Sequence, residues 1–155
     1  MALPFNNLVN FVKTTGMKLI IINGPNLNLT GKREQDVYGN KTFEVYLEEL
    51  RRAFPDIEID FFQSNVEGEI INKLHETGFS YTGIILNAGG YTHTSIAIAD
   101  AVKAIQVPVV EVHISNIMSR EEFRHISLTG RNAAGIITGF GLESYRLAVS
   151  YFATG

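Results

Sequence analysis

Short apolar runs alternate with segments of helical period along the chain from Met17 onward. Five of the runs predict β-strands, which span Lys18 to Asn23, Ile57 to Gln63, Gly83 to Leu86, Val107 to Val112 and Gly135 to Thr138. The first run is unbroken and apolar from Leu19 to Ile22, which is typical of a strand buried on both faces. Such strands occur in parallel sheets that carry helices on both sides.

The segments between the strands place apolar residues on one helical face and therefore predict helices. These face residues are Phe43, Leu47, Leu50 and Phe54, then Ile70, Ile71 and Leu74, then Ile96, Ala97, Ala101, Val102 and Ile105 within Thr94 to Ile105, and finally Leu142, Tyr145, Val149 and Phe152. Because strands and helices alternate, we predict an α/β fold. The expected architecture is a flavodoxin-like, doubly wound, five-stranded parallel sheet with the strand order 2-1-3-4-5.

Polar residues mark three of the predicted helix starts. Thr42 is the candidate N-cap of the first helix. Asn65 is the candidate N-cap of the second helix, which carries Glu67 in its first turn. The segment from Ser119 to Glu122 has the sequence of a capping box, so a short helix is expected to begin there.

The composition is that of one globular domain. The chain has 155 residues, of which 45% are hydrophobic, and this is enough for a single core. The net charge of −3 disfavours nucleic acid as a partner, and no apolar run approaches the roughly 20 residues that cross a membrane. Residues 1–16 lack the features of a signal peptide and are interpreted as an N-terminal extension or cloning remnant, which leaves 17–155 as a single domain.

The chain contains no cysteine, which excludes disulfides, zinc thiolates and thiol nucleophiles. This composition is compatible with the reducing cytoplasm, where we expect the protein to act. The first strand is not followed by GxGxxG, and no GxxxxGK[ST] segment occurs, so the common phosphate-binding loops are not predicted.

Polar or glycine-rich stretches follow three of the predicted strands. They run from Asn23 to Asn28, from Asn87 to His93 and from His113 to Asn116. The carboxyl ends of neighbouring parallel strands lie along one edge of a sheet, which is where open α/β sheets bind ligands. The three stretches are therefore expected to form one pocket.

Glu111 and His113 are the first candidates for chemistry in this pocket. Alternate residues of a strand point to the same face, so this carboxylate and imidazole should emerge together, about 7 Å apart along the backbone. A buried charge is costly unless it is paired. A carboxylate beside an imidazole also favours the protonated ring, which is the form from which a general acid must start.

The charged loop from Gly31 to Gly39 allows two interpretations. Glycines near both ends suit a mobile lid over the pocket, whereas the loop taken alone is more simply explained as a solvated surface loop. His75 and His125 are interpreted as surface residues.

Five segments of the chain resemble the type II 3-dehydroquinate dehydratases. They are Asn23-Gly24-Pro25-Asn26-Leu27, Lys32-Arg33-Glu34 to Tyr38-Gly39, Asn87-Ala88-Gly89-Gly90 with Thr92-His93-Thr94-Ser95, Glu111-Val112-His113-Ile114-Ser115-Asn116 and Arg120-Glu121-Glu122-Phe123-Arg124. The resemblance runs from about Met17 to Tyr151, with every segment in the family's order and spacing. The chain departs from the family in its N-terminal extension, at Leu128 to Asn132, and at Gln35, where the family usually has proline. This last difference is expected to affect the lid more than the chemistry.

The resemblance implies a reaction, the reversible dehydration of 3-dehydroquinate to 3-dehydroshikimate by an anti elimination through an enolate, without metal or other cofactor. It assigns Tyr38 as the base, Arg33 as its support, Asn26 as a holder of the enolate through a water, and His113 as the general acid. A free tyrosine has a pKa of about 10, which must fall by about 3 for a base that works near pH 7. One nearby cation typically lowers a pKa by about 1 to 3, so Arg120 is expected to assist.

The resemblance also implies how the substrate is bound. Asn87, His93 and Arg124 would bind its hydroxyls. The backbone N–H groups of Ile114 and Ser115, with the Ser115 hydroxyl, would bind its carboxylate, and backbone donors at a strand end suit such a cradle.

The family's dodecamer of four trimers is the expected assembly, with Asp100 reaching the site of a neighbouring subunit. Two other interpretations remain open on the residues alone. One is a flavodoxin-like module that binds flavin or nucleotide, which would leave Tyr38, Arg33 and His113 unexplained. The other is a non-catalytic homologue, although every expected catalytic residue type is present. The sequence does not distinguish aromatic biosynthesis from quinate breakdown, because both use the same reaction.

Overall fold

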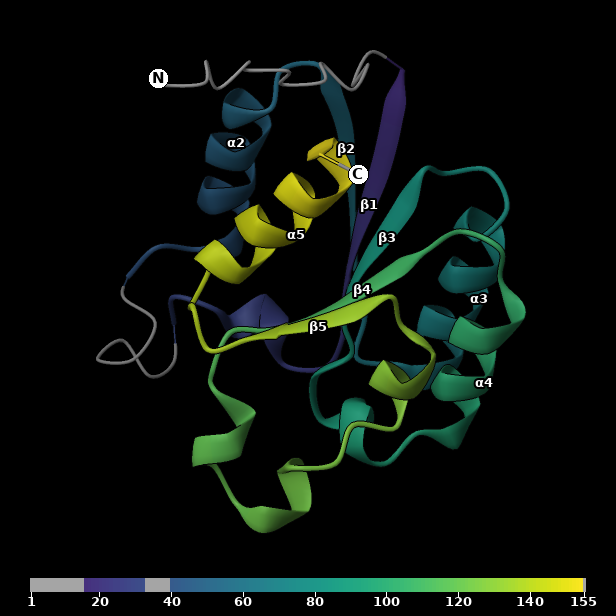
Figure 1. The fold of residues 1–155 in the computed structure, drawn as a ribbon. Coiled ribbons are helices and arrows are strands. Elements are labelled where there is room, and N and C mark those ends of the chain that lie inside the picture. The colour runs from purple at the N-terminus through teal and green to yellow at the C-terminus, as the bar shows by residue number, and fades with distance from the viewer. Residues whose placement is uncertain (1–15, 33–39, 155) are drawn as a thin grey trace, which may run out of the picture.

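The computed structural model describes residues 16–32 and 40–154. Its sheet has five parallel strands in the order β2-β1-β3-β4-β5, which confirms the predicted order and fold class (Figure 1). The strands are β1 (Met17–Asn23), β2 (Ile57–Gln63), β3 (Gly83–Asn87), β4 (Val109–His113) and β5 (Gly135–Thr138). The predicted base Tyr38, its support Arg33 and the N-terminal extension lie outside the described residues.

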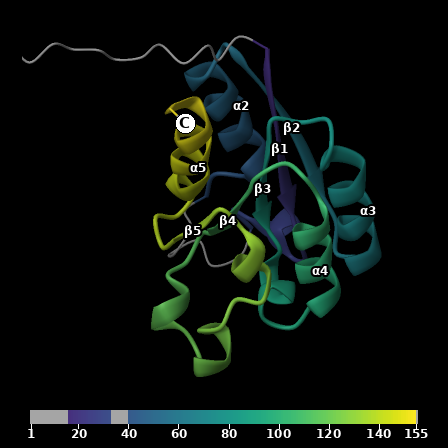
Figure 2. The same ribbon diagram turned by 45° about the vertical axis from the view of Figure 1, so that its right-hand side comes forward.

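Four α-helices cover the two faces of the sheet in the described part of the chain, and both ribbon views place them in pairs (Figures 1 and 2). The first pair is α2 (Phe43–Ala53) and α5 (Glu143–Thr154), and the second is α3 (Glu67–Thr77) and α4 (Ile96–Ala104). Each pair closes its own apolar core against the sheet, because successive strand residues point to opposite faces. Leu19 and Ile21 of β1 face the α2 and α5 side, whereas Ile20 and Ile22 face the α3 and α4 side.

The strand boundaries follow the predicted ones closely, and β4 shows the largest shift. It begins at Val109 rather than Val107, because the Val107 N–H donates to the Gly78 carbonyl and Pro108 has no N–H to give to a ladder. It extends to His113, so the histidine is the last residue of the strand. Helix α4 is also shorter than predicted and begins at Ile96, where the Ser95 side chain accepts from the Ile98 N–H.

Two of the predicted helix starts are wrong. Asn65 does not cap α3, because its side-chain oxygen accepts from the backbone N–H of Asn26 and from the Gln63 amide. The capping box at Ser119 is not formed either, since the Ser119 hydroxyl donates to the Asn116 carbonyl. The chain there makes two short 3₁₀ helices, η3 (Ile117–Ser119) and η4 (Glu122–Arg124). Thr42, in contrast, accepts from the Val45 N–H and caps α2 as predicted.

The sheet register aligns the polar strand ends. Asn23 of β1 lies beside Asn87 of β3, and the Gly24 N–H donates to the Asn87 carbonyl. His113, the last residue of β4, lies beside Thr138 of β5. Asn23, Asn87 and His113 therefore lie along one edge of the sheet. Within residues 16–32 and 40–154, no helix has the length and hydrophobicity to span a membrane.

Candidate active site

A cavity of about 310 Å³ lies at this edge and joins the three predicted stretches. Each stretch contributes lining residues, which are Pro25, Asn26 and Leu27 from the first, Asn87, Gly89, Gly90 and His93 from the second, and His113, Ile114 and Ser115 from the third. Leu29, Thr30, Ile117, Arg120 and Arg124, which follow the first and third stretches, complete the lining. All the predicted site residues in the described part of the chain line this cavity except Glu111 and Asp100. The prediction that three strand ends form one pocket is confirmed.

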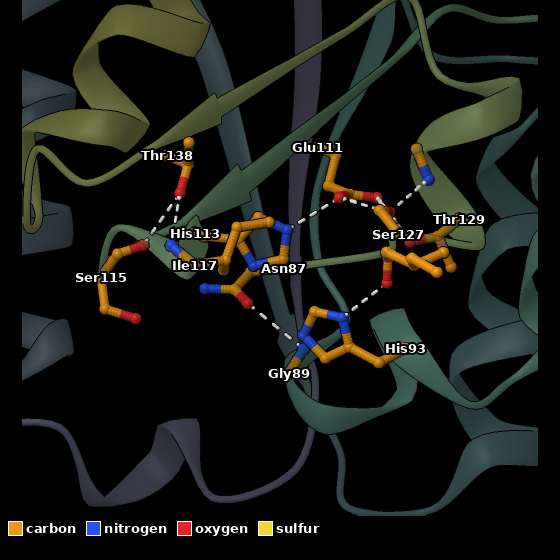
Figure 3. Close-up of polar contacts among 12 residues, drawn as sticks. Asn87, Gly89, His93, Glu111, His113, Ser115, Ile117, Ser127, Thr129 and Thr138 are labelled. Atoms are coloured by element: carbon orange, nitrogen blue, oxygen red, sulfur yellow. Dashed lines mark hydrogen bonds and ion pairs between the residues drawn. The ribbon is translucent and has the colours of Figure 1, made fainter. Parts of the chain in front are cut away.

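Glu111 and His113 form a buried pair at the end of β4 (Figure 3). The Nε2 of His113 lies 2.7 Å from the Oε1 of Glu111, and their side chains are 6% and 1% exposed. Glu111 sits behind the histidine, whereas His113 lines the cavity. Because the carboxylate engages Nε2, Nδ1 is the nitrogen left to exchange a proton with a bound substrate.

Two hydroxyls complete the hydrogen bonding of the Glu111 carboxylate. Ser127 donates to it at 2.7 Å and Thr129, in η5 (Thr129–Asn132), donates at 2.5 Å. Burial alone would raise the pKa of Glu111, but hydrogen bonds from His113 and Thr129, the charge of His113 and the Ser127 hydroxyl together hold this pKa below its ordinary value. The carboxylate is therefore ionised at neutral pH and can orient the imidazole. Sequence reasoning missed both hydroxyls.

His93 lies close to His113 across the same cavity. The two rings are nearly parallel, with centroids 6.2 Å apart and an interplanar angle of 24°. The Nδ1 of His93 is 2.8 Å from the Ile126 carbonyl oxygen, which can only accept, so Nδ1 carries the hydrogen. In the neutral ring Nε2 is then an acceptor, which suits a substrate hydroxyl.

The cavity has a positive lining. Arg120 and Arg124 line it with the two histidines, and among the described residues no carboxylate does so. Arg124 Nε donates to Glu121 at 2.8 Å, and Arg120 Nη1 lies 3.4 Å from the Ser115 hydroxyl. The loop that carries Ser115 is held in turn by Thr138, whose hydroxyl donates to the Ser115 carbonyl at 2.9 Å. This lining suits a small anion with several hydroxyls.

Asn26 enters the site in a special backbone conformation. Its φ is 68°, a left-handed value that asparagine tolerates better than most residues. Its N–H donates to Asn65 at 3.0 Å, so the misassigned cap residue in fact fixes this turn. Asn26 lines the cavity, and its side chain makes no capping hydrogen bond to the short helix that follows it, Leu27–Leu29.

Asp100 lies elsewhere on the molecule. It is exposed on α4 and lines a second hollow of about 320 Å³ together with Ile96, Leu128 and Arg131. Within the described residues, no three His, Asp or Glu side chains are grouped as a metal site would require. Of the two other histidines, His75 is exposed, as predicted, and His125 is half-buried, with its Nε2 2.9 Å from the Arg120 carbonyl.

Comparison with known proteins gives consistent matches. The family model described as dehydroquinase class II matches residues 17–153. A 3-dehydroquinate dehydratase from Exiguobacterium sp. is 57% identical over 134 residues, which cover 86% of this chain and 92% of that protein. The solved type II dehydroquinase of Butyrivibrio crossotus has a TM-score of 0.82 at 45% identity and covers 88% of this chain and 97% of its own. That of Propionibacterium acnes has a TM-score of 0.86 at 35% identity, with 91% and 99% covered. The matched range contains every segment that lines the cavity.

Proposed function

The chain belongs to the class II dehydroquinase family and is a hydro-lyase that dehydrates 3-dehydroquinate; we propose that it does so by an anti elimination through an enolate. In this reaction a base removes the proton beside the ketone, donors hold the enolate oxygen, and an acid protonates the departing hydroxyl. The alternative of a flavin- or nucleotide-binding module is not favoured, because the matched relatives are dehydratases.

His113 is the general acid in this proposal. Glu111 is ionised and hydrogen-bonded to one ring nitrogen, and it stabilises the imidazolium that must be present before the hydroxyl leaves. The other ring nitrogen delivers the proton. The buried Glu111–His113 pair at the end of β4, whose other residues are valines, is the observation that carries the proposed mechanism.

Tyr38 is the base, supported by Arg33, and both are assigned by resemblance to the family. A tyrosine must be ionised to act as a base, and a nearby guanidinium favours the phenolate. Arg120, which lines the cavity, supplies a second positive charge in addition to that of Arg33. Asn26 holds the enolate oxygen through a water.

The substrate's polar groups are shared among the cavity's lining residues. Asn87, His93 and Arg124 bind the hydroxyls, and the His93 geometry supports this because its Nε2 is left as an acceptor. Ile114 and Ser115 bind the carboxylate through their backbone N–H groups and the Ser115 hydroxyl. The positive lining of the cavity agrees with an anionic substrate.

We further infer a cytoplasmic dodecamer of four trimers, in which Asp100 reaches the site of a neighbouring subunit. Asp100 is exposed and does not line the cavity of its own chain, which agrees with this role. A mass in solution near that of twelve chains supports the assembly, and a monomer contradicts it. Fractionation of cells tests the compartment.

The proposed function is tested by following the ultraviolet absorbance of the conjugated enone after 3-dehydroquinate is added to the purified protein. The account expects turnover without added cofactor. The matched variant is Tyr38→Phe, which is expected to bind substrate while losing turnover, because it keeps the ring and removes the basic oxygen. No product at micromolar enzyme would contradict the function, and substantial activity in the variant would contradict the role of Tyr38.

A further inference from the structure

We propose that Tyr145 is a positioning residue for the reaction, because its buried hydroxyl fixes the orientation of the Asn87 amide that faces the cavity. The inference rests on the proposed function, in which Asn87 binds a substrate hydroxyl. Tyr145 lies on α5 and contributes nothing to the cavity lining. It acts only through Asn87.

Three buried side chains form a continuous chain of hydrogen bonds beneath the cavity. The Tyr145 hydroxyl lies 2.9 Å from Asn87 Nδ2 and 2.8 Å from Asn23 Oδ1. The three residues are 0%, 3% and 1% exposed, respectively. Asn87 alone of the three lines the cavity, so these hydrogen bonds lead from Asn23 of β1 through Tyr145 of α5 to Asn87 of β3 and the substrate site.

The direction of every bond in this chain follows from one backbone group. The Gly89 N–H donates to Asn87 Oδ1 at 3.2 Å (Figure 3), and an N–H cannot accept, so the Asn87 oxygen must face Gly89. Its Nδ2 then faces Tyr145 and donates to the phenolic oxygen. The hydroxyl has a single hydrogen, which goes to Asn23 Oδ1.

The reversed amide would be costly. Turning Asn87 over would place its NH₂ group against the N–H of the half-buried Gly89 and its oxygen against the phenol, so that two donors would meet where one hydrogen bond now forms. With Asn87 in the observed orientation, Asn23 Nδ2 is the only side-chain polar atom of Asn23, Asn87 and Tyr145 that lacks a hydrogen-bond partner among the described residues. The Asn87 orientation is thus fixed from both of its polar atoms.

This orientation matters for substrate because it decides what Asn87 offers to the cavity. One hydrogen of Nδ2 is used by Tyr145 and one lone pair of Oδ1 by Gly89. The remaining hydrogen and lone pair are available to a substrate hydroxyl in a fixed arrangement. Without the phenol oxygen, the amide loses one of its two anchors and can rotate.

Tyr145 itself is held rigidly and stays protonated. Its ring packs against Phe43 with centroids 4.9 Å apart in an edge arrangement and lies beside Tyr46 at 6.4 Å. Burial raises the pKa of Tyr145 well above its usual range, and the bonds with Asn87 and Asn23 offset this only in part. The hydroxyl therefore keeps both its donor and its acceptor roles at any pH at which the enzyme works.

The test is steady-state kinetics of Tyr145→Phe with 3-dehydroquinate. The expected result is a KM raised about 5- to 10-fold with kcat changed less, as for the loss of one hydrogen bond that orients a binding group. Tyr46→Phe is the matched control, because it removes a phenol oxygen from the same apolar core, and within the described residues that oxygen makes no hydrogen bond. It should stay within about twofold of the wild-type KM.

A double-mutant cycle separates positioning from a general loss of packing. If Tyr145 acts through Asn87, Tyr145→Phe should cause no further loss of kcat/KM in an Asn87→Ala background. Additive losses, or a wild-type KM in the single variant, would overturn the inference. Asn23→Leu provides a second route should Tyr145→Phe fold poorly. It removes the acceptor of the phenol hydrogen and should also raise KM, whereas an unchanged KM would overturn the inference.

The proposed function fails separately from this inference. A wild-type protein that forms no product contradicts the function and the inference that depends on it. A wild-type protein that turns over, with Tyr145→Phe indistinguishable from Tyr46→Phe, contradicts the inference alone.

Discussion

Glu111 carries a full negative charge at a position that solvent does not reach. Its side chain is stabilised by an imidazole and two hydroxyls rather than by water. Because its pKa is held below the ordinary value, the ionised carboxylate stabilises the fold at neutral pH. This contribution is present above the pKa of an unfolded glutamate, about 4.3. It is lost as the pH falls through the lower pKa of the folded state.

Glu111→Gln should therefore make the stability of the protein less dependent on pH between pH 7 and pH 3. At pH 7 the variant should be less stable by about 1–3 kcal/mol, because an amide cannot accept from three donors. Below about pH 4.5 the wild type begins to lose the carboxylate's contribution, so the melting temperatures of the two proteins should converge as the pH falls. Thermal unfolding from pH 7 to pH 3 measures this, with exposed Glu44→Gln as the control. Parallel curves for wild type and Glu111→Gln would contradict the role assigned to this carboxylate.

The sequence predicts the pairing of Glu111 with His113 but not the two hydroxyls that complete the hydrogen bonding of the carboxylate. Strand alternation is a local rule, so residues two apart, such as Glu111 and His113, can be paired from the sequence. Ser127 and Thr129 are 16 and 18 residues from Glu111 in the sequence. Thr129 begins the short helix η5, and the segment that leads to it has no helical or strand periodicity from which its position could be predicted. The same limit applies to Tyr145, which is 58 residues from Asn87 and reads only as a core position of its helix.

Close contact between strand ends sets the shape of the site at the scale of elements. Gly24, just after β1, lies against the backbone of Ala88, just after β3, and a Cβ at Gly24 would be 2.5 Å from the Ala88 carbonyl oxygen. Backbone cannot move aside as a flexible side chain can. The spacing between the turn that holds Asn26 and the loop that follows Asn87 therefore depends on glycine here.

Gly24→Ala should push these two loops apart. We expect a loss of stability of about 1–3 kcal/mol from overpacking. We also expect a fall in kcat/KM of about 10-fold or more, because small misplacements of binding groups are costly. Gly68→Ala is the control, since a Cβ there meets nothing within 4 Å and alanine is the better helix former in α3. A Gly24→Ala protein with wild-type stability and kinetics would show that this contact does not shape the site.

Element positions were largely predictable, whereas of three predicted caps only Thr42 forms. Two-sided burial makes strands such as β1 readable as unbroken apolar runs. A cap depends on which of several donors an asparagine side chain meets. Asn65 could serve the helix that follows it, but in the folded chain it meets the Asn26 N–H from a segment 39 residues away.

At the scale of the whole molecule, the proposed mechanism divides the reaction between two parts of the chain. The proposed acid, His113, lies at the end of β4, where it is hydrogen-bonded to Glu111, and the proposed base belongs to the segment between β1 and α2. The fold class predicts that such strand ends and loops meet at one edge of the sheet. The family resemblance, rather than any spacing, predicts that Tyr38 is the base.

This division of labour is tested most directly by His113→Ala in deuterated solvent with 3-dehydroquinate. Exchange of the proton beside the ketone and formation of the enone are followed in the same sample. The account predicts that dehydration falls by about 10²- to 10⁴-fold while exchange persists, because the base still forms the enolate and only the acid for the departing hydroxyl is missing. Equal loss of exchange and dehydration, or dehydration at the wild-type rate, would contradict it.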